Sequence, residues 1–242
     1  RALKNDSRVK KETKEKILKI AREYNYRPNN IAQALAENNT KIIALMLPSA
    51  PRSVSDPFFL EFLHGINDIA YQKGYSLSIP PVEQENFVSF KKINRNLNAD
   101  GVILTEPLLN DPRIKYLKEN KIPFVFNGNP MAEDDTAWVD TDNQLGAYQA
   151  VDYLIKKGHQ KIAAVTGPLN LVAGKYRLEG YYQALKDNQI EINKDLIFES
   201  DFTEKGAYLT AKKLIEYHNE ITAVFAANDL MALGIIKSLK DA

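Results

Sequence analysis

The chain has 242 residues, of which 44% are hydrophobic and 26% charged, so it can bury a substantial core in one or two domains. It contains no cysteine, which excludes a disulfide framework and thiolate metal sites. No apolar run approaches the roughly 18 residues of a membrane span, and the first residues are too polar for a signal peptide. These features are consistent with an intracellular protein that has no membrane partner.

The net charge of +1 hides an uneven distribution along the chain. Residues 1–41 hold 11 Lys and Arg against 5 Asp and Glu, whereas residues 42–242 hold 21 against 26. A basic head on an acidic body is typical of a protein whose head binds a polyanion. A solvated lysine-rich helix has the same charge, and charge alone does not separate the two interpretations.

The basic head contains two predicted helices. Residues 11–26 have the periodicity of an amphipathic helix. Its apolar face comprises Ile17, Ile20, Ala21 and Tyr24. Pro28 then stands at the first turn of a second helix over residues 29–36, where its missing N–H costs nothing. A helix of barely two turns is marginal alone in water and needs a partner, unless the segment is a plain linker.

From residue 41 onward, short β-rich runs alternate with amphipathic stretches. Strands are expected at residues 41–48, 75–79, 101–106, 123–128, 137–141, 161–167, 196–202 and 223–228. Helices are expected at residues 57–73, 84–97, 111–120, 143–157, 174–188, 203–217 and 229–240. The strands show little polar alternation, so the pattern predicts an α/β fold with doubly wound parallel sheets covered on both faces. Eight strands fit one large sheet or two smaller ones, with a candidate seam in the link over 128–136.

Polar and aromatic residues gather after the carboxyl ends of the predicted strands, where ligands bind in open α/β sheets. This set comprises Phe58, Phe59, Asp142, Arg177, Phe202, Asn228 and Asp229. Carboxylates, amides and a guanidinium form hydrogen bonds with hydroxyl groups, while aromatic rings cover a sugar face or stack on a base. The sequence therefore favours a site for a small polyhydroxylated or heterocyclic molecule over a phosphate.

Each member of this set also has a purely structural interpretation. Asp142 and Asp229 both stand next to a predicted helix start and suit an N-cap. At least one of the two phenylalanines at the start of helix 57–73 suits the core. Arg177 suits an ion pair with Glu179 or a contact with a neighbouring helix. Only the convergence of these residues at strand ends favours a binding site.

Enzyme signatures are absent from the sequence. There is no G-x-G-x-x-G after the first strand, no P-loop, no G-x-S-x-G and no H-E-x-x-H. The three histidines, His64, His159 and His218, are scattered and have no clear partner. We therefore expect no catalytic residues, no cofactor and no metal site.

Several motifs resemble one family along nearly the whole chain. The run RALKNDSRVKKETKEKILKIAREYNYRPNNIAQAL is similar to the end of the DNA-binding domain and the hinge of the LacI/GalR family of bacterial transcriptional repressors. The similarity continues through DPFFLEFLHGINDIAYQKGYSL, ADGVIL, VDTDNQLGAYQAVDYLIKKGHQKIAAVTGP, YRLEGYYQAL, DFTEKGAY and AVFAANDLMALG. The resemblance implies two periplasmic-binding-protein-like subdomains behind a partial all-α head and a hinge helix.

The resemblance also implies domain boundaries. Residues 1–27 would be the C-terminal part of a helix-turn-helix domain, 28–40 the hinge helix and linker, and 41–142 and 143–242 two incomplete effector-binding subdomains. Arg1 is not an initiator methionine, and IKSLKDA stops inside a helical pattern. We therefore expect the start of the helix-turn-helix and the C-terminal end of the family fold to be missing.

In the family pattern, five residues of the head meet operator DNA. Arg1 would reach a base edge, Thr13 would lie near the phosphates and Asn29 would hold the backbone. Ala32 would face the minor groove, and Leu35 would wedge into the central base step. The small hinge helix would therefore fold on DNA, beside its copy in a homodimer.

The resemblance places the seven strand-end residues in a cleft for a small-molecule effector, most simply a sugar. It implies a cytoplasmic homodimer that represses a carbohydrate-utilisation operon and responds to that effector. A solute-binding protein of a sugar transport system has the same core fold but needs a signal peptide and has no use for a basic head. A sugar-metabolising enzyme would need a catalytic constellation.

Overall fold

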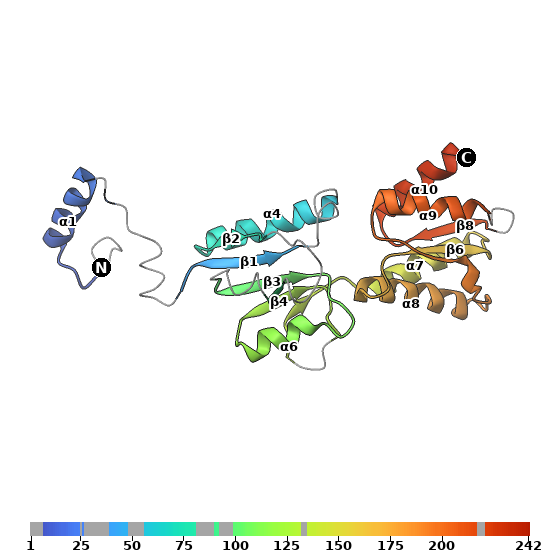
Figure 1. Cartoon of the computed structure of the whole chain (residues 1–242), viewed down its shortest axis with the longest axis horizontal. Helices are drawn as coiled ribbons and strands as arrows, with labels where there is room; N and C mark the ends of the chain where they lie inside the picture. The colour runs from blue at the N-terminus through green and yellow to red at the C-terminus, as the bar shows by residue number, and fades with distance from the viewer. Residues whose placement is uncertain are drawn as a thin grey trace. The chain divides into compact units, whose positions relative to one another are not determined.

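The computed structural model describes residues 7–24, 26, 39–47, 56–80, 90–91, 99–131, 135–216 and 221–242 (Figure 1). The chain separates into two compact units, Arg1–Lys41 and Ile42–Ala242. The predicted hinge helix and most of the predicted helix over 84–97 lie outside the described residues. The same is true of four predicted DNA-binding residues and one histidine, namely Arg1, Asn29, Ala32, Leu35 and His218.

The first unit contains α1 (Lys11–Glu23), which confirms the predicted amphipathic helix and ends three residues earlier than expected. The N–H of Tyr24 donates to the carbonyl of Ile20 and closes the last turn. None of the side chains of α1 is buried, and Thr13 stands exposed in its first turn.

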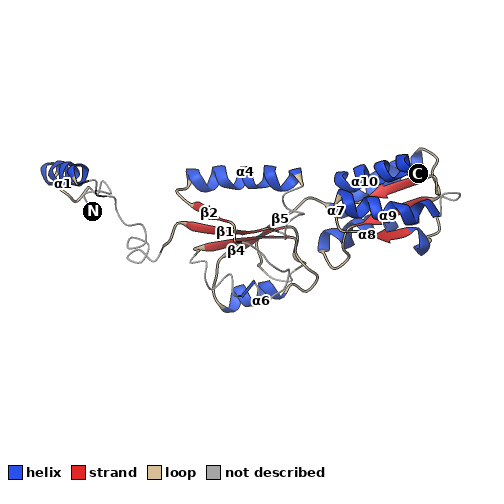
Figure 2. Cartoon of the chain, turned by 45° about the horizontal axis from the view of Figure 1, so that its top comes forward, coloured by secondary structure: helices blue, strands red, loops and turns tan. Residues whose placement is uncertain are grey.

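The first sheet of the second unit has five parallel strands in the order β2-β1-β3-β4-β5. They span Ile42–Met46 (β1), Ser76–Ser78 (β2), Gly101–Thr105 (β3), Phe124–Asn127 (β4) and Trp138–Val139 (β5). Helices α4 (Pro57–Gln72) and α6 (Pro112–Glu119) cover opposite faces of this sheet (Figure 2). On the α6 side, Leu117 packs with Val102, Leu104 and Phe126 in one apolar cluster.

The second sheet has three parallel strands in the order β7-β6-β8. Its strands are β6 (Ile162–Thr166), β7 (Ile197–Glu199) and β8 (Ala223–Ala226), and the 3-10 turn η2 (Lys194–Leu196) leads into β7. Its helices are α7 (Asn143–Lys156), α8 (Val172–Asp187), α9 (Glu204–Glu216) and α10 (Asp229–Asp241).

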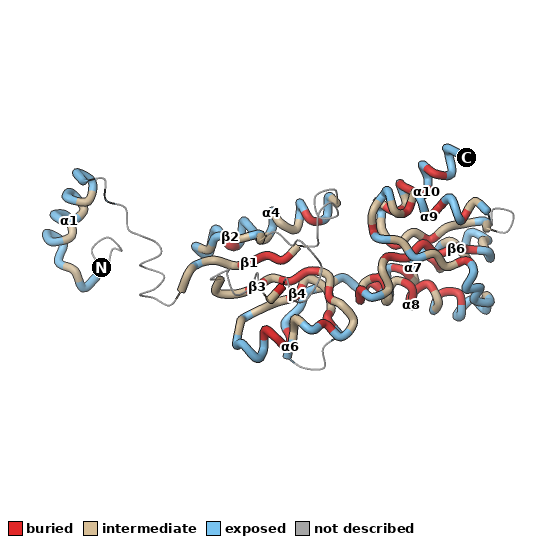
Figure 3. The backbone as a smooth tube through the Cα atoms, viewed as in Figure 1, coloured by how far each residue is buried: buried red, intermediate tan, exposed pale blue. Residues whose placement is uncertain are grey.

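The central strand β6 is buried along its whole length (Figure 3). Its side chains alternate between two apolar clusters. Ala163 and Val165 join the cluster formed with α9 and α10. Ile162 and Ala164 join the cluster formed with α7 and α8. A strand with both faces covered reads as a continuous apolar run, because neither set of alternating side chains meets water. The predicted α/β fold with parallel sheets is therefore confirmed, as two sheets rather than one. The subdomain boundary near residue 142 stays a prediction.

Helices α7 and α8 approach closely at Gly180. A Cβ built on Gly180 would lie 2.2 Å from the carbonyl oxygen of Gln144 and 2.9 Å from the Cβ of Ala147. The next residue, Tyr181, donates a hydrogen bond from its hydroxyl to the carbonyl of Ile162 at 2.8 Å. That hydrogen bond ties α8 to the start of β6, so α8 is held against both the sheet and α7.

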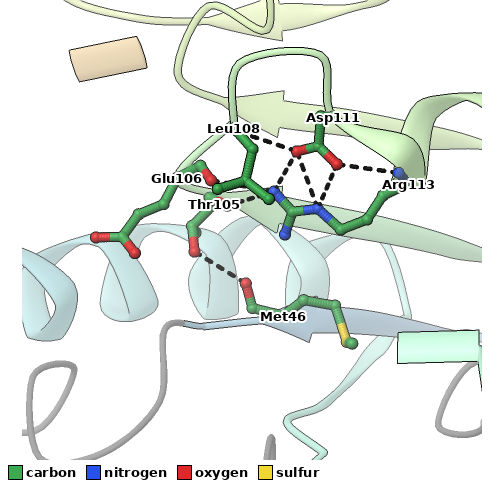
Figure 4. Close-up of polar contacts among 6 residues, drawn as sticks. All are labelled: Met46, Thr105, Glu106, Leu108, Asp111 and Arg113. Atoms are coloured by element: carbon green, nitrogen blue, oxygen red, sulfur yellow. Dashed lines mark hydrogen bonds and ion pairs between the residues drawn. The ribbon is translucent and has the colours of Figure 1, made fainter. Parts of the chain in front are cut away.

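The loop after β3 is fixed by a buried ion pair between Asp111 and Arg113 (Figure 4). Asp111 is 5% exposed and accepts from the backbone N–H groups of Leu108 and Arg113, at 3.1 and 3.0 Å. The Arg113 Nη2 lies 2.6 Å from Asp111 Oδ2 and also donates to the carbonyl of Glu106 at 3.0 Å. Glu106 and Asn110 both adopt positive φ, which costs a non-glycine residue free energy. The ion pair therefore holds the loop in a shape that its backbone alone would not favour.

Gly180→Ala should destabilise the protein, because the added methyl group meets a backbone carbonyl that cannot move without separating the two helices. We expect a loss of at least about 2 kcal/mol in the free energy of unfolding, as for other overpacked sites. Gly146→Ala on α7 is the matched control, since its Cβ meets nothing within 4 Å. Within a helix that change should stabilise by about 0.5–1 kcal/mol. Urea denaturation followed by circular dichroism measures both, and equal midpoints would contradict the close approach.

Asp111→Asn should destabilise the second unit by about 3 kcal/mol, the lower end for breaking a buried ion pair, because asparagine keeps one acceptor oxygen. The control is Glu119→Gln, which removes an exposed i,i+4 contact with Lys115 (3.9 Å) and should leave the unfolding midpoint near that of the wild type. Thermal unfolding of both variants decides the matter. An unchanged midpoint for Asp111→Asn would show that the loop does not depend on this pair.

Candidate functional site

Arg177 on α8 contacts three segments that surround the second sheet. Its Nε donates to Asn143 Oδ1 at 2.8 Å, at the start of α7. Its Nη1 donates to the carbonyl of Ala227 at 2.6 Å, directly after β8. Its guanidinium carbon lies 5.5 Å from the ring centroid of Phe202, in the loop after β7. Of the two structural alternatives for Arg177, the contact with a neighbouring helix is confirmed by Asn143 on α7. The ion pair with Glu179 is wrong, because Glu179 pairs with Lys175 at 3.7 Å.

The charge of Arg177 is partly desolvated and faces acidic groups. Burial lowers the pKa of the Arg177 guanidinium, and the carboxylates of Asp140, Asp229 and Asp56 oppose this shift in that order. Arginine keeps its charge in proteins, so the site holds a fixed cation. A single cation among three nearby carboxylates leaves little net attraction for an anionic ligand.

Phe202 serves as the platform beneath the guanidinium. Its ring is 8% exposed and lies on Gly167, where a Cβ would come within 2.0 Å of the ring Cζ. Phe202 adopts a φ of 65°, a left-handed conformation that is unfavourable for a bulky residue. Asn228 Nδ2 donates to the Phe202 carbonyl at 3.0 Å and supports this turn. The ring therefore acts on the site mainly through Arg177.

The start of α10 is capped by Asn228. Its Oδ1 accepts from the N–H of Met231 at 2.8 Å. The alternative that Asp229 caps this helix is wrong, because Asp229 is the first helical residue and its side chain is exposed. The Asp229 carboxylate is thus available to a ligand near Arg177.

The turn between β5 and α7 contains two carboxylates with different roles. Asp142 is exposed and caps α7, with Oδ1 accepting from the N–H of Leu145 at 2.9 Å, as its structural interpretation predicted. Asp140 accepts from the N–H of Asn129 at 2.9 Å and from Asn143 Nδ2 at 3.0 and 3.1 Å. Sequence reasoning missed Asp140 and Asn143. The available signal was the position of Asp140, which comes directly after β5.

The two phenylalanines at the start of α4 separate into core and surface. Asp56 caps the helix by accepting from the N–H of Phe58 at 3.0 Å. Phe59 is 6% exposed, which confirms that at least one ring belongs to the core. Phe58 is 54% exposed and stacks on Phe62 with ring centroids 5.9 Å apart. Of these two rings, Phe58 is therefore the one that a ligand can reach.

Main-chain contacts join the loops that follow the two central strands. The N–H of Leu109 donates to the carbonyl of Asn170 at 3.0 Å, and the N–H of Val172 donates to the carbonyl of Pro107 at 3.0 Å. Leu108 packs against the apolar cluster of α9 and α10. The carboxyl ends of β3 and β6 are therefore linked at the level where the predicted site residues lie.

Other kinds of site find no support in the described part of the chain. Among those residues, no group of three His, Asp or Glu side chains is arranged to hold a metal ion. His64 pairs with Asp68 at 3.6 Å on the surface of α4. An apolar depression between α9, β8 and α10 has Thr222 as its polar side chain and otherwise aliphatic walls, which do not suit a sugar. The described helices include none that is both long and apolar enough to cross a membrane.

Comparisons with known proteins agree on one family. Residues 40–242 match the periplasmic binding proteins and sugar binding domain of the LacI family, and residues 1–29 match the bacterial regulatory proteins of the lacI family. The chain is 32% identical over 244 residues to the HTH-type transcriptional regulator AglR of Rhizobium meliloti (strain 1021), which covers 100% of this chain and 68% of that protein.

Solved structures of regulators show the same fold. A CelR–cellobiose complex matches with a TM-score of 0.77 and 28% identity, over 100% of this chain and 72% of that chain. The Lac repressor dimer bound to operator and the anti-inducer ONPF matches with a TM-score of 0.84 and 27% identity, over the same shares. With both of its units matched, the chain belongs to the LacI family of bacterial transcriptional regulators.

Proposed function

We propose that this chain acts in the cytoplasm as a homodimeric repressor of a carbohydrate-utilisation operon, and that a neutral sugar bound near Arg177 changes its affinity for double-stranded operator DNA. The observation that carries the proposal is the convergence of Arg177, Asn228 and Asp229 at the carboxyl ends of the second sheet, inside a domain that matches the family's sugar-binding domain. The role is regulatory and not catalytic.

The chemistry around Arg177 favours a neutral polyhydroxylated ligand. Two of its nitrogens are engaged by Asn143 and Ala227, while Nη2 makes no hydrogen bond to a described residue and can donate to a sugar hydroxyl. The exposed carboxylate of Asp229 and the second oxygen of Asp142 supply acceptors for hydroxyl groups.

Aromatic residues complete the proposed site. An exposed ring can contact the sugar, whereas a buried ring supports the site from the core. Phe58 covers the C–H face of the sugar ring, whereas Phe59 and Phe202 support the site from within the core. The carboxylates near Arg177 disfavour a sugar phosphate, since they would repel its charge.

The head supplies operator binding. We assign base-edge contact to Arg1, phosphate contact to Thr13 and backbone contact to Asn29, with Ala32 facing the minor groove and Leu35 wedged between bases. Thr13 is exposed in the first turn of α1, a position that suits a phosphate ligand. The match of residues 1–29 to the family's regulatory domain favours this function over a solute-binding protein, which needs no such head.

Leu35→Ser should weaken operator binding by at least about tenfold and leave sugar binding unchanged, because a hydroxyl side chain cannot replace an apolar wedge between unstacked bases. Leu35→Met is the matched control, since it keeps an apolar side chain of similar volume and should retain most of the affinity. Gel-shift titrations at one salt concentration compare the three proteins. Equal operator affinity of Leu35→Ser and wild type would refute the wedge.

Arg177→Lys should reduce sugar affinity by at least about tenfold, because lysine keeps the charge but cannot serve Asn143, Ala227 and a hydroxyl group together. The sugar-free variant should still bind operator, while its response to the sugar is lost. Lys175→Arg on the same helix exchanges the same two residue types at an exposed ion pair and should leave both affinities unchanged.

The measurement begins with a thermal-shift panel of mono- and disaccharides, cellobiose among them, and their phosphates, because a ligand that binds only the native state raises the melting temperature. Calorimetry with the sugar that gives the largest shift then compares the variants. A panel without any shift would refute the sugar proposal, and a preference for the phosphates would refute the neutral ligand. Wild-type affinity in Arg177→Lys would remove Arg177 from the site.

A further inference from the structure

A continuous chain of side-chain hydrogen bonds runs from the backbone of the first sheet to Arg177. Asn129 comes two residues after the end of β4, and its N–H donates to Asp140 Oδ2 at 2.9 Å. Asn143 Nδ2 donates to both oxygens of Asp140, at 3.0 and 3.1 Å. Asn143 Oδ1 accepts from Arg177 Nε at 2.8 Å. Four groups are thus connected, although no direct hydrogen bond joins Asp140 and Arg177 among the described residues.

Chemistry permits only one orientation of the amide in this chain. The ionised Asp140 carboxylate only accepts hydrogen bonds, and the Arg177 guanidinium only donates them. Asn143 must therefore present its amino group to Asp140 and its oxygen to Arg177. Since Asn143 is 7% exposed, water cannot readily satisfy the amide if it turns over.

The hydrogen bond from Asn129 gives Asp140 a role beyond its own turn. Asp140 also accepts from the N–H of Thr141 at 2.8 Å, so part of its role is local. Asn129 is 11 residues away in sequence and follows a different strand. Asp142, only two residues further on, caps α7 and makes no comparable link.

We propose that Asp140 is a positioning residue, which fixes Arg177 through Asn143 and ties it to the backbone after β4. Its consequence for regulation rests on the proposed function. A sugar that binds the Arg177 guanidinium and shifts it would also shift Asn143 and Asp140. The displacement would then reach the backbone of Asn129, which follows β4 of the first sheet. Through Asp140, sugar binding at the second sheet would therefore change the structure of the first sheet.

The variant Asp140→Asn tests this route without any sugar. Asparagine at 140 has one acceptor oxygen and an amino group, which cannot accept from Asn129, Thr141 and Asn143 together. The Nε–H of Arg177 is observed by ¹H–¹⁵N correlation in the full chain, and its signal is assigned from its absence in Arg177→Lys. We expect its exchange rate with water to rise about tenfold in Asp140→Asn, as for the loss of one hydrogen bond.

Asp152→Asn is the matched control. Asp152 lies on α7 and, like Asp140, accepts from an asparagine amide, that of Asn188 at 3.3 Å. It also pairs with Lys156 at 2.6 Å but belongs to no chain that reaches Arg177. The Asp152→Asn variant should therefore leave the exchange of the Arg177 Nε–H within about twofold of the wild type, since hydrogen bonds open locally.

An unchanged exchange rate in Asp140→Asn would overturn the proposal and reduce Asp140 to a local turn residue. Equal acceleration in both variants would also overturn it, because the effect would then come from general loss of stability. If Asp140→Asn does not fold, Asp140→Ser removes the carboxylate with a smaller side chain and is held to the same expectation. Failure of the sugar panel would refute the proposed function and leave this measurement intact.

Discussion

Several segments around the second sheet meet at one partly desolvated guanidinium, that of Arg177. Moving a charge out of water costs several kcal/mol unless hydrogen bonds and nearby charges replace the solvent. Arg177 gains these from the amide of Asn143, the carbonyl of Ala227 and the face of Phe202. Each partner lies on a different segment, so the start of α7, the end of β8 and the loop after β7 must all be in register for the cation to be stable. Of the guanidinium nitrogens, Nη2 makes no hydrogen bond to a described residue.

Among the described residues, two sets of hydrogen bonds link the sheets of the second unit, one through main-chain groups and one through side chains. The loop after β3 meets the segment after β6 through main-chain hydrogen bonds, and its shape is fixed by the buried pair of Asp111 and Arg113. The turn after β5 acts through side chains, with Asp140 between Asn129 and Asn143. The first set consists of main-chain hydrogen bonds between two loops, whereas the second reaches the Arg177 guanidinium directly through side chains. The set through Asp140 is thus the one that ends on the side chain of the proposed ligand site.

Much of the fold could be predicted from the sequence, because its signals are local. Buried parallel strands appear as short apolar runs, and β6 is buried at every position. Caps are local as well, and the interpretation of Asp142 as a cap is confirmed. Arg177 contacts the end of β8 through the carbonyl of Ala227, but the partners of its guanidinium were not visible in the sequence. One partner is the backbone carbonyl of Ala227. The other is the side-chain amide of Asn143, which lies 34 residues from Arg177 in the sequence.

Asp140 escaped detection for a related reason. In the run VDTDN, both carboxylates stand next to a helix start, and helix-capping rules draw attention to the second. What distinguishes the first is the N–H of Asn129, which only the pairing of β4 with β5 brings close. The same limitation applied at α10, where Asn228 takes the cap and frees Asp229. Sequence patterns identify which groups are present, and the tertiary fold decides which of them remain available to a ligand.

The uneven charge of the chain gives this site a further consequence for DNA binding. The head holds a surplus of six positive charges, while residues 42–242 carry five more negative charges than positive ones. DNA phosphates attract the head and repel the body, which favours operator contact through the head. Under the proposed function, the sugar binds the second unit and DNA binds the head, so the two do not compete for one surface. The proposed sugar would then act by a change in the structure of the second unit, where one set of the hydrogen bonds that join its two sheets ends on Arg177.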